Sequence, residues 1–220
     1  MPRDETTVGR EPLSSFLARA VAAAVVGMLV ARALGADRLV MPLTVAASTG
    51  FVAIAVAAGG MEWGYGRLMV GALVLCWLGD VVGPHSFVSG LFSFLLAHLV
   101  LVAAFWSLGV TAKPLLAALG VAGVASAAVI LAIYPHINGP ERLPAIAYAA
   151  AISVMVAFAA GTRGGPGWRL RLAAAVLFYV SDIDVALWRF VGGDFPYAWG
   201  CYPLYYSACV MLALTAAPPR

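Results

Sequence analysis

The chain has 220 residues, of which 63% are hydrophobic and only 10% are charged, and its formal net charge is +3. A soluble domain carries about 25% charged residues, so this composition excludes a globular protein with a water-exposed surface and indicates a chain surrounded by lipid. The small net charge and the absence of a basic run argue against nucleic acid as a partner.

Hydrophobic runs long enough to span a bilayer, roughly 17–25 residues, occur eight times. The predicted helices cover 14–33, 38–58, 67–83, 86–108, 113–134, 142–161, 169–190 and 197–216. They form one transmembrane domain (14–216) between an N-terminal tail (1–13) and a C-terminal tail (217–220). The first run could alternatively be a signal peptide, but its length and mixed flanking charges favour a retained helix. The predicted fold class is an all-α polytopic transmembrane bundle.

The basic residues are distributed unevenly between the two sides of this bundle. Nine of the thirteen Lys and Arg residues fall on the side of both termini, and four fall on the other side. Basic residues accumulate in cytoplasmic loops, so we expect both termini in the cytoplasm and the bundle in a bacterial inner membrane. The nine are Arg3, Arg10, Arg19, Arg67, Lys113, Arg163, Arg169, Arg171 and Arg220; the four are Arg32, Arg38, Arg142 and Arg189.

Three ionisable residues, Asp80, His98 and Asp182, lie inside predicted spans. An ionisable group at depth costs at least a few kcal/mol, so it normally faces a cavity or a partner. Asp80 is 13 residues after Arg67 and Asp182 is 13 residues after Arg169. Since both helices run in the same direction, the carboxyl groups should lie at one level, about 20 Å from the inner edge.

His98 lies on the helix that returns inward, roughly 18 Å from its outer end, somewhat below the level of the aspartates. An outward-facing cavity could hold all three side chains, or His98 could make only a structural hydrogen bond. The sequences around the aspartates, Leu75-Cys76-Trp77-Leu78-Gly79-Asp80 and Leu177-Phe178-Tyr179-Val180-Ser181-Asp182, also resemble one another. This internal similarity suggests two four-helix halves in parallel orientation.

Further polar residues surround these three in the predicted arrangement. Arg189 lies two helical turns after Asp182 and either contacts a phosphate or the carboxylate, or extends to the interface. Tyr205 and Tyr206 could reach the cavity from the last helix, whereas Asp184 points away from Asp182. The cysteines have no metal-ligand spacing, so we read them as small core residues. They are Cys76, Cys201 and Cys209.

These residues occur in an order that resembles the YhhN family of membrane proteins, whose vertebrate members are lysoplasmalogenases. The resemblance covers most of residues 38–212 and departs from the family pattern at Leu101, Asp184 and Cys209. The matching elements are Met41-Pro42-Leu43-Thr44, Leu78-Gly79-Asp80, the run from Phe87 through Gly90 and Phe94 to His98, Leu143-Pro144 with Tyr148, Phe178 with Ser181-Asp182, and Tyr205-Tyr206.

The resemblance implies an intramembrane hydrolase that cleaves the vinyl ether bond of a lysoplasmalogen. Asp80 and Asp182 would form the acid–base pair, in an order that the sequence leaves open, and His98 would orient water or one carboxylate. Such a reaction needs one carboxyl group as acid and a second to stabilise the cation or activate water. The expected substrate-binding residues are Arg189, Ser181, Tyr205, Tyr206, Phe94 and Tyr148.

Other functions stay open at this stage. Paired intramembrane carboxylates are also typical of proton-coupled carriers, and a structural membrane protein is a third reading. The absence of G-x-S-x-G disfavours a serine esterase. We expect no cofactor and no metal, although two Asp and one His could ligate one. The partners would be a lysophospholipid and the membrane lipids. An enzyme needs both carboxyl groups in one closed-ended cavity, whereas a carrier needs a path to both membrane faces.

Overall fold

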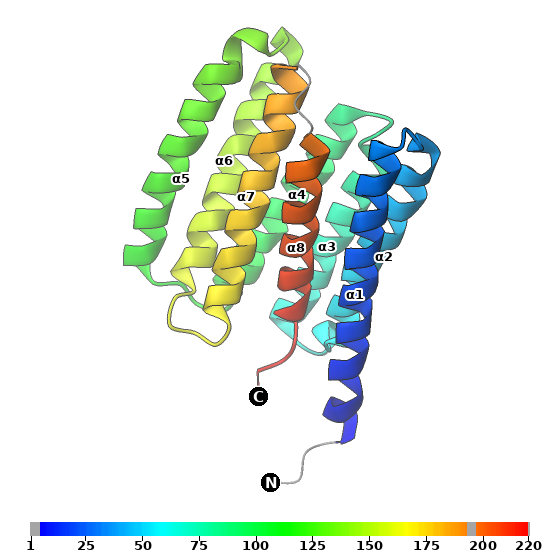
Figure 1. Cartoon of the computed structure of the whole chain (residues 1–220). Coiled ribbons are helices and arrows are strands. Elements are labelled where there is room, and N and C mark those ends of the chain that lie inside the picture. Colours follow the sequence, from blue (N-terminus) through cyan, green and yellow to red (C-terminus); the bar gives the residue numbers. More distant parts are fainter. Residues whose placement is uncertain (1–4, 193–196, 220) are drawn as a thin grey trace.

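The computed structural model describes residues 5–192 and 197–219, and this part of the chain is all-helical (Figure 1). Short 3₁₀ turns occur at Asp37–Leu39, Gly60–Glu62 and Tyr134–His136. The predicted all-α bundle of about eight long helices is thus confirmed. The helices are α1 (Glu5–Ala33), α2 (Val40–Ala57), α3 (Gly64–Val82), α4 (Phe87–Ser107), α5 (Ala112–Ile133), α6 (Gly139–Gly161), α7 (Trp168–Phe190) and α8 (Tyr197–Leu214).

From α2 to α8, each helix end lies within three residues of its predicted position. The exception is the start of α1, at Glu5 rather than residue 14, because hydropathy locates the apolar part of a helix (Leu13–Ala33) but not its polar extension. Local signals fix other ends. Ser86 caps α4 by accepting a hydrogen bond from the Ser89 N–H, and Pro140 stands in the first turn of α6, where its fixed φ suits a helix start. Arg3 and Arg220, used above for orientation, lie outside the described residues.

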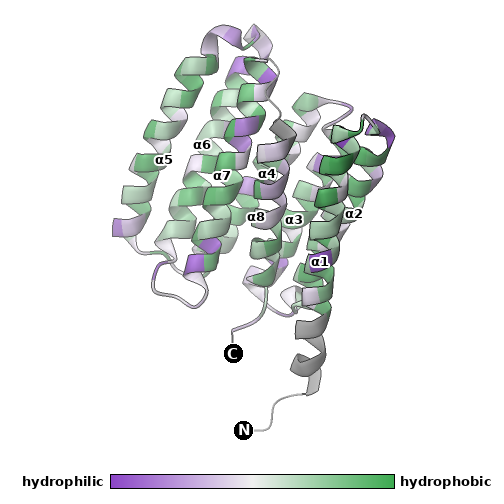
Figure 2. Cartoon of the chain, viewed as in Figure 1, coloured by the Kyte–Doolittle hydropathy of each residue, from purple (hydrophilic) through white to green (hydrophobic). Residues whose placement is uncertain are grey.

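Six helices, α1 to α6, are long and apolar enough to cross a membrane by length and composition, within the described ranges. Figure 2 shows mixed hydropathy along α7 and α8. These two have fewer apolar residues because α7 contains five charged residues and α8 contains four tyrosines and Pro203. With 23 residues, α7 is nevertheless as long as α6. The polar residues of these two helices belong to the interior described below.

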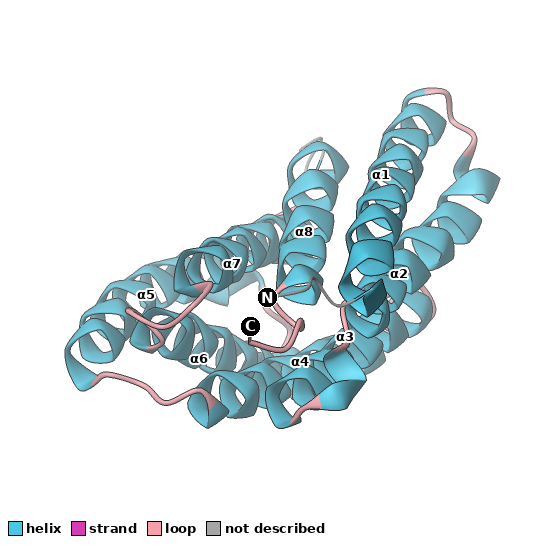
Figure 3. Cartoon of the chain, turned by 90° about the horizontal axis from the view of Figure 1, so that it is seen from below, coloured by secondary structure: helices cyan, strands magenta, loops and turns pink. Residues whose placement is uncertain are grey.

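The helices pack as two related halves. In the first half, α1 packs on α2, α2 on α3 and α3 on α4; in the second, α5 packs on α6, α6 on α7 and α7 on α8. The halves meet where α4 packs against α6 (Figure 3) and where α2 packs against α8. Exchanging each helix for the one four places later in the chain reproduces these contacts, as two parallel repeats require. Both described ends of the chain lie at the same end of the bundle (Figure 1).

Helices α3 and α4 approach each other closely at two glycines. A Cβ added at Gly90 would lie 2.7 Å from the Gly83 Cα, and one added at Gly79 would lie 2.6 Å from the Phe94 ring. Small residues allow such close packing in lipid, where no hydrophobic force drives helices together. The contact brings the Phe94 side chain to the level of Asp80, one residue after Gly79.

Replacing Gly90 by Ala should therefore destabilise the bundle. The new methyl group would meet backbone rather than a flexible side chain, and overpacking of this kind costs about 1–3 kcal/mol. We expect a lower Tm of the purified protein in detergent. Gly71→Ala on α3 is the matched control, because nothing lies within 4 Å of its added Cβ. An equal Tm for both variants would contradict the close approach.

Candidate active site

A pocket of about 800 Å³ lies among the helices, with lining residues from all eight. This volume is within the range of small-molecule sites, about 300–1,000 Å³. Its rim is formed by the turns after α1 and α3, which contribute Asp37, Pro84 and His85. These turns lie at the end of the bundle opposite the described termini (Figure 1). The pocket therefore opens toward that end.

The opposite end of the bundle is closed by polar contacts that do not line the pocket. The Trp63 Nε1–H donates to the Ala216 carbonyl at 2.7 Å, and the Tyr65 and Thr215 hydroxyls are 2.6 Å apart. The buried Arg171 donates through Nε to the Thr162 hydroxyl. No residue of this network is among the pocket-lining residues, so the pocket ends inside the described bundle.

Asp80 lines the pocket from α3 and accepts two hydrogen bonds from hydroxyl groups. The Ser48 hydroxyl donates from α2, and the Tyr205 hydroxyl donates from α8 at 3.0 Å, both to Oδ2. Ser48 is fully buried. Two donors on one oxygen suit an ionised carboxylate, because hydrogen bonds of this kind are strongest to a charged acceptor.

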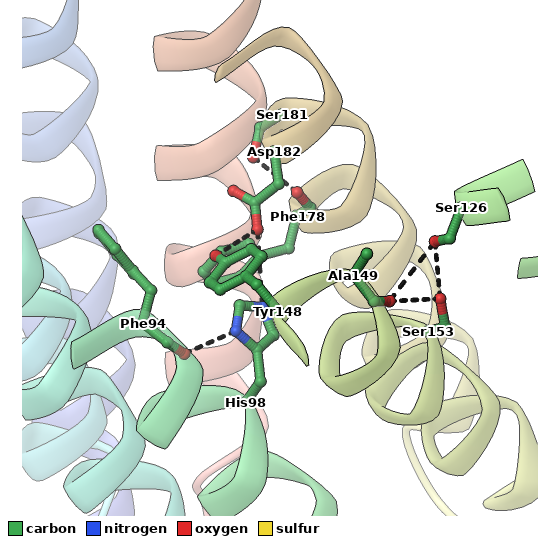
Figure 4. Close-up of polar contacts among 9 residues, drawn as sticks. All are labelled: Phe94, His98, Ser126, Tyr148, Ala149, Ser153, Phe178, Ser181 and Asp182. Carbon is green, nitrogen blue, oxygen red and sulfur yellow. Dashed lines mark hydrogen bonds and ion pairs between the residues drawn. The ribbon is translucent and has the colours of Figure 1, made fainter. Parts of the chain in front are cut away.

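Asp182 lines the same pocket from α7, with different partners (Figure 4). The Tyr148 hydroxyl of α6 donates to its Oδ2 at 2.7 Å, and the His98 Nε2 of α4 lies 3.7 Å from that oxygen. His98 is fully buried and does not line the pocket, so it lies behind the carboxyl group. The structure thus brings all three predicted ionisable residues together, two on the pocket wall and one beneath it.

The hydrogen bonds of His98 define where its proton lies. Its Nδ1 is 2.6 Å from the Phe94 carbonyl oxygen (Figure 4), which can only accept, so Nδ1 carries a hydrogen. Its Nε2 is buried without a hydrogen-bond partner among the described residues, and Asp182 Oδ2 is the facing acceptor. Two lone pairs would face each other there unless a proton sits on one of them. The geometry therefore favours one proton held by this pair of side chains.

The partners of the two carboxyl groups come from helices that are equivalent in the two halves of the bundle. Asp80 on α3 is approached from α2 and α8, and Asp182 on α7 is approached from α6 and α4. Each carboxyl group thus has one partner from its own half and one from the other half. The cross-half partners differ, Tyr205 for Asp80 and His98 for Asp182. Equivalent positions therefore carry unlike chemistry, which is what an acid and a base in one site require.

Aromatic rings connect the two carboxyl sites. The buried Phe178 packs edge to face on His98, with ring centroids 4.8 Å apart, and on Tyr205 at 5.3 Å. Phe94 contacts Tyr205 at 5.8 Å and Phe178 at 6.5 Å. Edge-to-face pairs have a preferred geometry, so these contacts fix the orientation of His98 and Tyr205.

These side chains fall within a segment that known proteins share: the sequence profile of the YhhN family matches residues 38–216. The chain belongs to the YhhN family. It is similar to a Mycobacterium tuberculosis protein named lysoplasmalogenase, with 32% identity over 160 residues, 68% of this chain and 59% of that protein. It is also 30% identical to human lysoplasmalogenase TMEM86B over 157 residues, 70% of this chain and 65% of the human protein.

The corresponding pig protein is 32% identical over 174 residues, covering 74% of this chain and 68% of the relative. The chain spans about three fifths of the length of the mycobacterial relative. No solved structure matches the chain. Asp80, His98 and Asp182 all lie in the YhhN-matched segment, whereas Arg32 and Asp37 precede it.

Of the remaining residues predicted to bind the substrate, some line the pocket and one does not. The Ser181 hydroxyl is fully buried, donates to the Phe178 carbonyl at 2.7 Å and does not line the pocket. Phe94, Tyr148, Tyr205 and Tyr206 do line it. The structure therefore does not bring Ser181 to a position where it would contact a bound molecule.

Arg189 also lines the pocket, but it already has a carboxylate partner. Its Nη2 is 2.7 Å from Oε1 of Glu141 on α6, and its guanidinium lies 4.6 Å from the centroid of the Phe87 ring. Asp184 lies outside the pocket, against Gly200 of α8. Within the described residues, no group of three or more His, Cys, Asp and Glu side chains converges as metal ligands would.

Sequence reasoning missed Ser48 and Glu141. Ser48 is uncharged within an apolar run, so hydropathy gives no sign of it; its place on α2 opposite Asp80 comes from helix packing. Glu141 lies in the first turn of α6, where acidic residues are common. The one available signal for Glu141 was its predicted position at the same membrane face as Arg189.

Proposed function

We propose that this YhhN-family protein is an intramembrane hydrolase that cleaves the vinyl ether bond of a lysoplasmalogen into a fatty aldehyde and a glycerophospho head group. The main support is that Asp80 and Asp182 line one pocket and are held by unlike partners. The names of the bacterial and mammalian relatives support the substrate class.

Vinyl ether hydrolysis begins when a proton is added to the outer carbon of the double bond, which leaves an oxocarbenium ion. Asp182 is the acid in this step, because a proton on its carboxyl group is what keeps two lone pairs from facing each other across the 3.7 Å to His98 Nε2. Asp80 is the base, because its two hydroxyl donors hold it as a carboxylate. A negative carboxylate beside the pocket also stabilises the cation, as in glycoside hydrolysis.

The second half of the reaction restores both groups. Water adds to the cationic carbon and gives its proton to Asp80, which produces a hemiacetal. Asp80 then returns that proton to the glycerol oxygen as the carbon–oxygen bond breaks, and Asp182 takes the proton of the hemiacetal hydroxyl. The products are the aldehyde and the free glycerol hydroxyl, and each carboxyl group ends in its starting state.

A carrier function is less well supported. Alternating access needs a route to both membrane faces, but the pocket lining includes no residue of the network at the termini end. Binding of substrate from one side and release of products to the same side fits such a pocket better.

The test is to incubate purified protein in detergent with a 1-alkenyl lysophospholipid in D₂O. We expect an aldehyde with one deuterium on the carbon next to the carbonyl, observed by mass spectrometry after immediate reduction to the alcohol. The matching saturated 1-alkyl lipid should be unchanged, because it has no double bond to protonate. Aldehyde without deuterium would contradict the acid-first mechanism. The absence of any aldehyde from a range of alkenyl lipids would reject the hydrolase proposal.

The predicted orientation gives a second experiment. Arg67, Lys113 and Arg169 lie at the end of the bundle where the described termini are found. We place this end on the cytoplasmic side of a bacterial inner membrane. A C-terminal green fluorescent protein fusion should then fluoresce in bacterial cells, and a C-terminal alkaline phosphatase fusion should be inactive. The reverse pattern would place the pocket opening in the cytoplasm.

A further inference from the structure

Among the described residues, the pairs Arg189–Glu141 and Arg32–Asp37 lie at the open end of the pocket, and they differ in length and exposure. Arg189 and Glu141 are 2.7 Å apart, and their side chains are 34% and 16% exposed. Arg32 and Asp37 are 3.5 Å apart, and their side chains are 38% and 73% exposed. The first pair is short and partly shielded, whereas the second is long and open to the pocket mouth.

The short pair has the features of a structural clamp. It connects the start of α6 to the end of α7, and the Phe87 ring covers the Arg189 guanidinium. Glu141 does not line the pocket. A ligand phosphate that displaced Glu141 would leave a poorly solvated carboxylate unpaired, at a large cost in free energy.

The long pair is placed to exchange partners with a ligand. Both Arg32 and Asp37 line the pocket, and Arg32 Nη2 also donates to the Tyr202 hydroxyl at 3.2 Å. Exposed ion pairs are worth little, typically about 0–1 kcal/mol. Separating the two side chains would therefore cost little if each gained a new partner of opposite charge.

Aliphatic side chains gather on one side of the pocket lining, although Tyr148, Asp182 and Arg189 belong to that side as well. The side formed by α1, α2 and α8 carries Arg32, Thr44, Tyr202, Tyr205 and Tyr206. The side formed by α5, α6 and α7 is lined mainly by aliphatic side chains, and α5 and α1 lie on opposite sides of the bundle (Figure 3). These aliphatic residues include Val129, Ile130, Ile133, Ala149, Ile183 and Ala186. An amphiphile would place its tail among them and its polar end beside α1.

We propose that Arg32 and Asp37 form the head-group subsite of this pocket, Arg32 binding the phosphate and Asp37 the ammonium group of a zwitterionic lysolipid. The subsite rests on the proposed function for the rest of the substrate. The exposed pair of Arg32 with Asp37 is exchanged for pairs of each residue with the ligand, and a guanidinium suits phosphate oxygens geometrically. Both residues precede the YhhN-matched segment, so they belong to a part of this chain that the family pattern does not cover.

The experiment measures binding of saturated 1-alkyl glycerolipids, which cannot be hydrolysed at a vinyl ether. Three heads are compared by calorimetry on the 220-residue protein in detergent: phosphoethanolamine, phosphate alone, and a free hydroxyl. Arg32→Gln should weaken binding of both phosphate-bearing lipids about tenfold, and leave the hydroxyl lipid unchanged. Asp37→Asn should weaken only the phosphoethanolamine lipid, by about threefold to tenfold.

Arg38→Gln is the matched control, because Arg38 is exposed in the same 3₁₀ turn and does not line the pocket. It should bind all three lipids as the wild type does. Equal losses for the three lipids in Arg32→Gln, or no head-dependent change in Asp37→Asn, would overturn the subsite. Binding is measured here without turnover. If the wild type releases no aldehyde, the hydrolase proposal alone is rejected, and the binding data still test the head-group subsite.

Discussion

Replacing Asp182 by Asn should lower kcat for aldehyde release by about 10²–10⁴-fold, the usual contribution of a positioned acid or base. Asn keeps the shape of the side chain and can still accept the hydrogen bond from Tyr148, but it has no acidic proton for the substrate carbon. KM should change little, because the pocket walls are unaltered. Initial rates of aldehyde release over a range of lipid concentrations separate the two constants.

Asp184→Asn is the control for this variant. Asp184 lies on the same helix, two residues later, but outside the pocket lining, so its kcat should stay near that of the wild type. A Tm measurement in detergent for both variants verifies that folding is retained. If Asp182→Asn is folded and turns over the lipid at the wild-type rate, Asp182 is not the acid.

The helix boundaries were predictable because lipid imposes a simple rule: each span needs a run of apolar residues of fixed minimum length. The same rule made Asp80, His98 and Asp182 conspicuous, since each interrupts such a run. The expectation that Asp80 and Asp182 lie at one level came from counting helical rise from Arg67 and Arg169. The sequence therefore allowed us to predict which charged residues lie within a helix and how far each lies from the helix end.

The partners of these residues were less predictable, because they depend on which helices are neighbours. Nothing in the sequence near Ser48 indicates that α2 packs beside α3 with this hydroxyl toward Asp80. Ser181 precedes Asp182, yet on a helix adjacent residues point about 100° apart, and its hydroxyl bonds to its own backbone. Arg189 was expected at a phosphate. Its ion pair with Glu141 could not be foreseen, because the two residues are 48 positions apart in the chain.

Replacing His98 by Asn should lower kcat by about a hundredfold with little change in KM. Asn keeps a short amide donor near the Phe94 carbonyl, but it removes the Nε2 whose lone pair faces Asp182 and favours a protonated carboxyl group there. His98 does not line the pocket, so ground-state binding should persist. We also expect the pH dependence of kcat to change shape, since the ring nitrogen that faces the Asp182 carboxyl group is gone.

Ser181→Ala is the matched control, because Ser181 is equally buried and also bonds to a backbone carbonyl of the site, that of Phe178. If a buried polar side chain near Asp182 matters only for packing, the two variants should have similar kcat values and the wild-type pH profile. A specific role of His98 instead predicts that only His98→Asn loses turnover and alters that profile. A rise in KM at constant kcat would show that His98 shapes the pocket and does not position the acid.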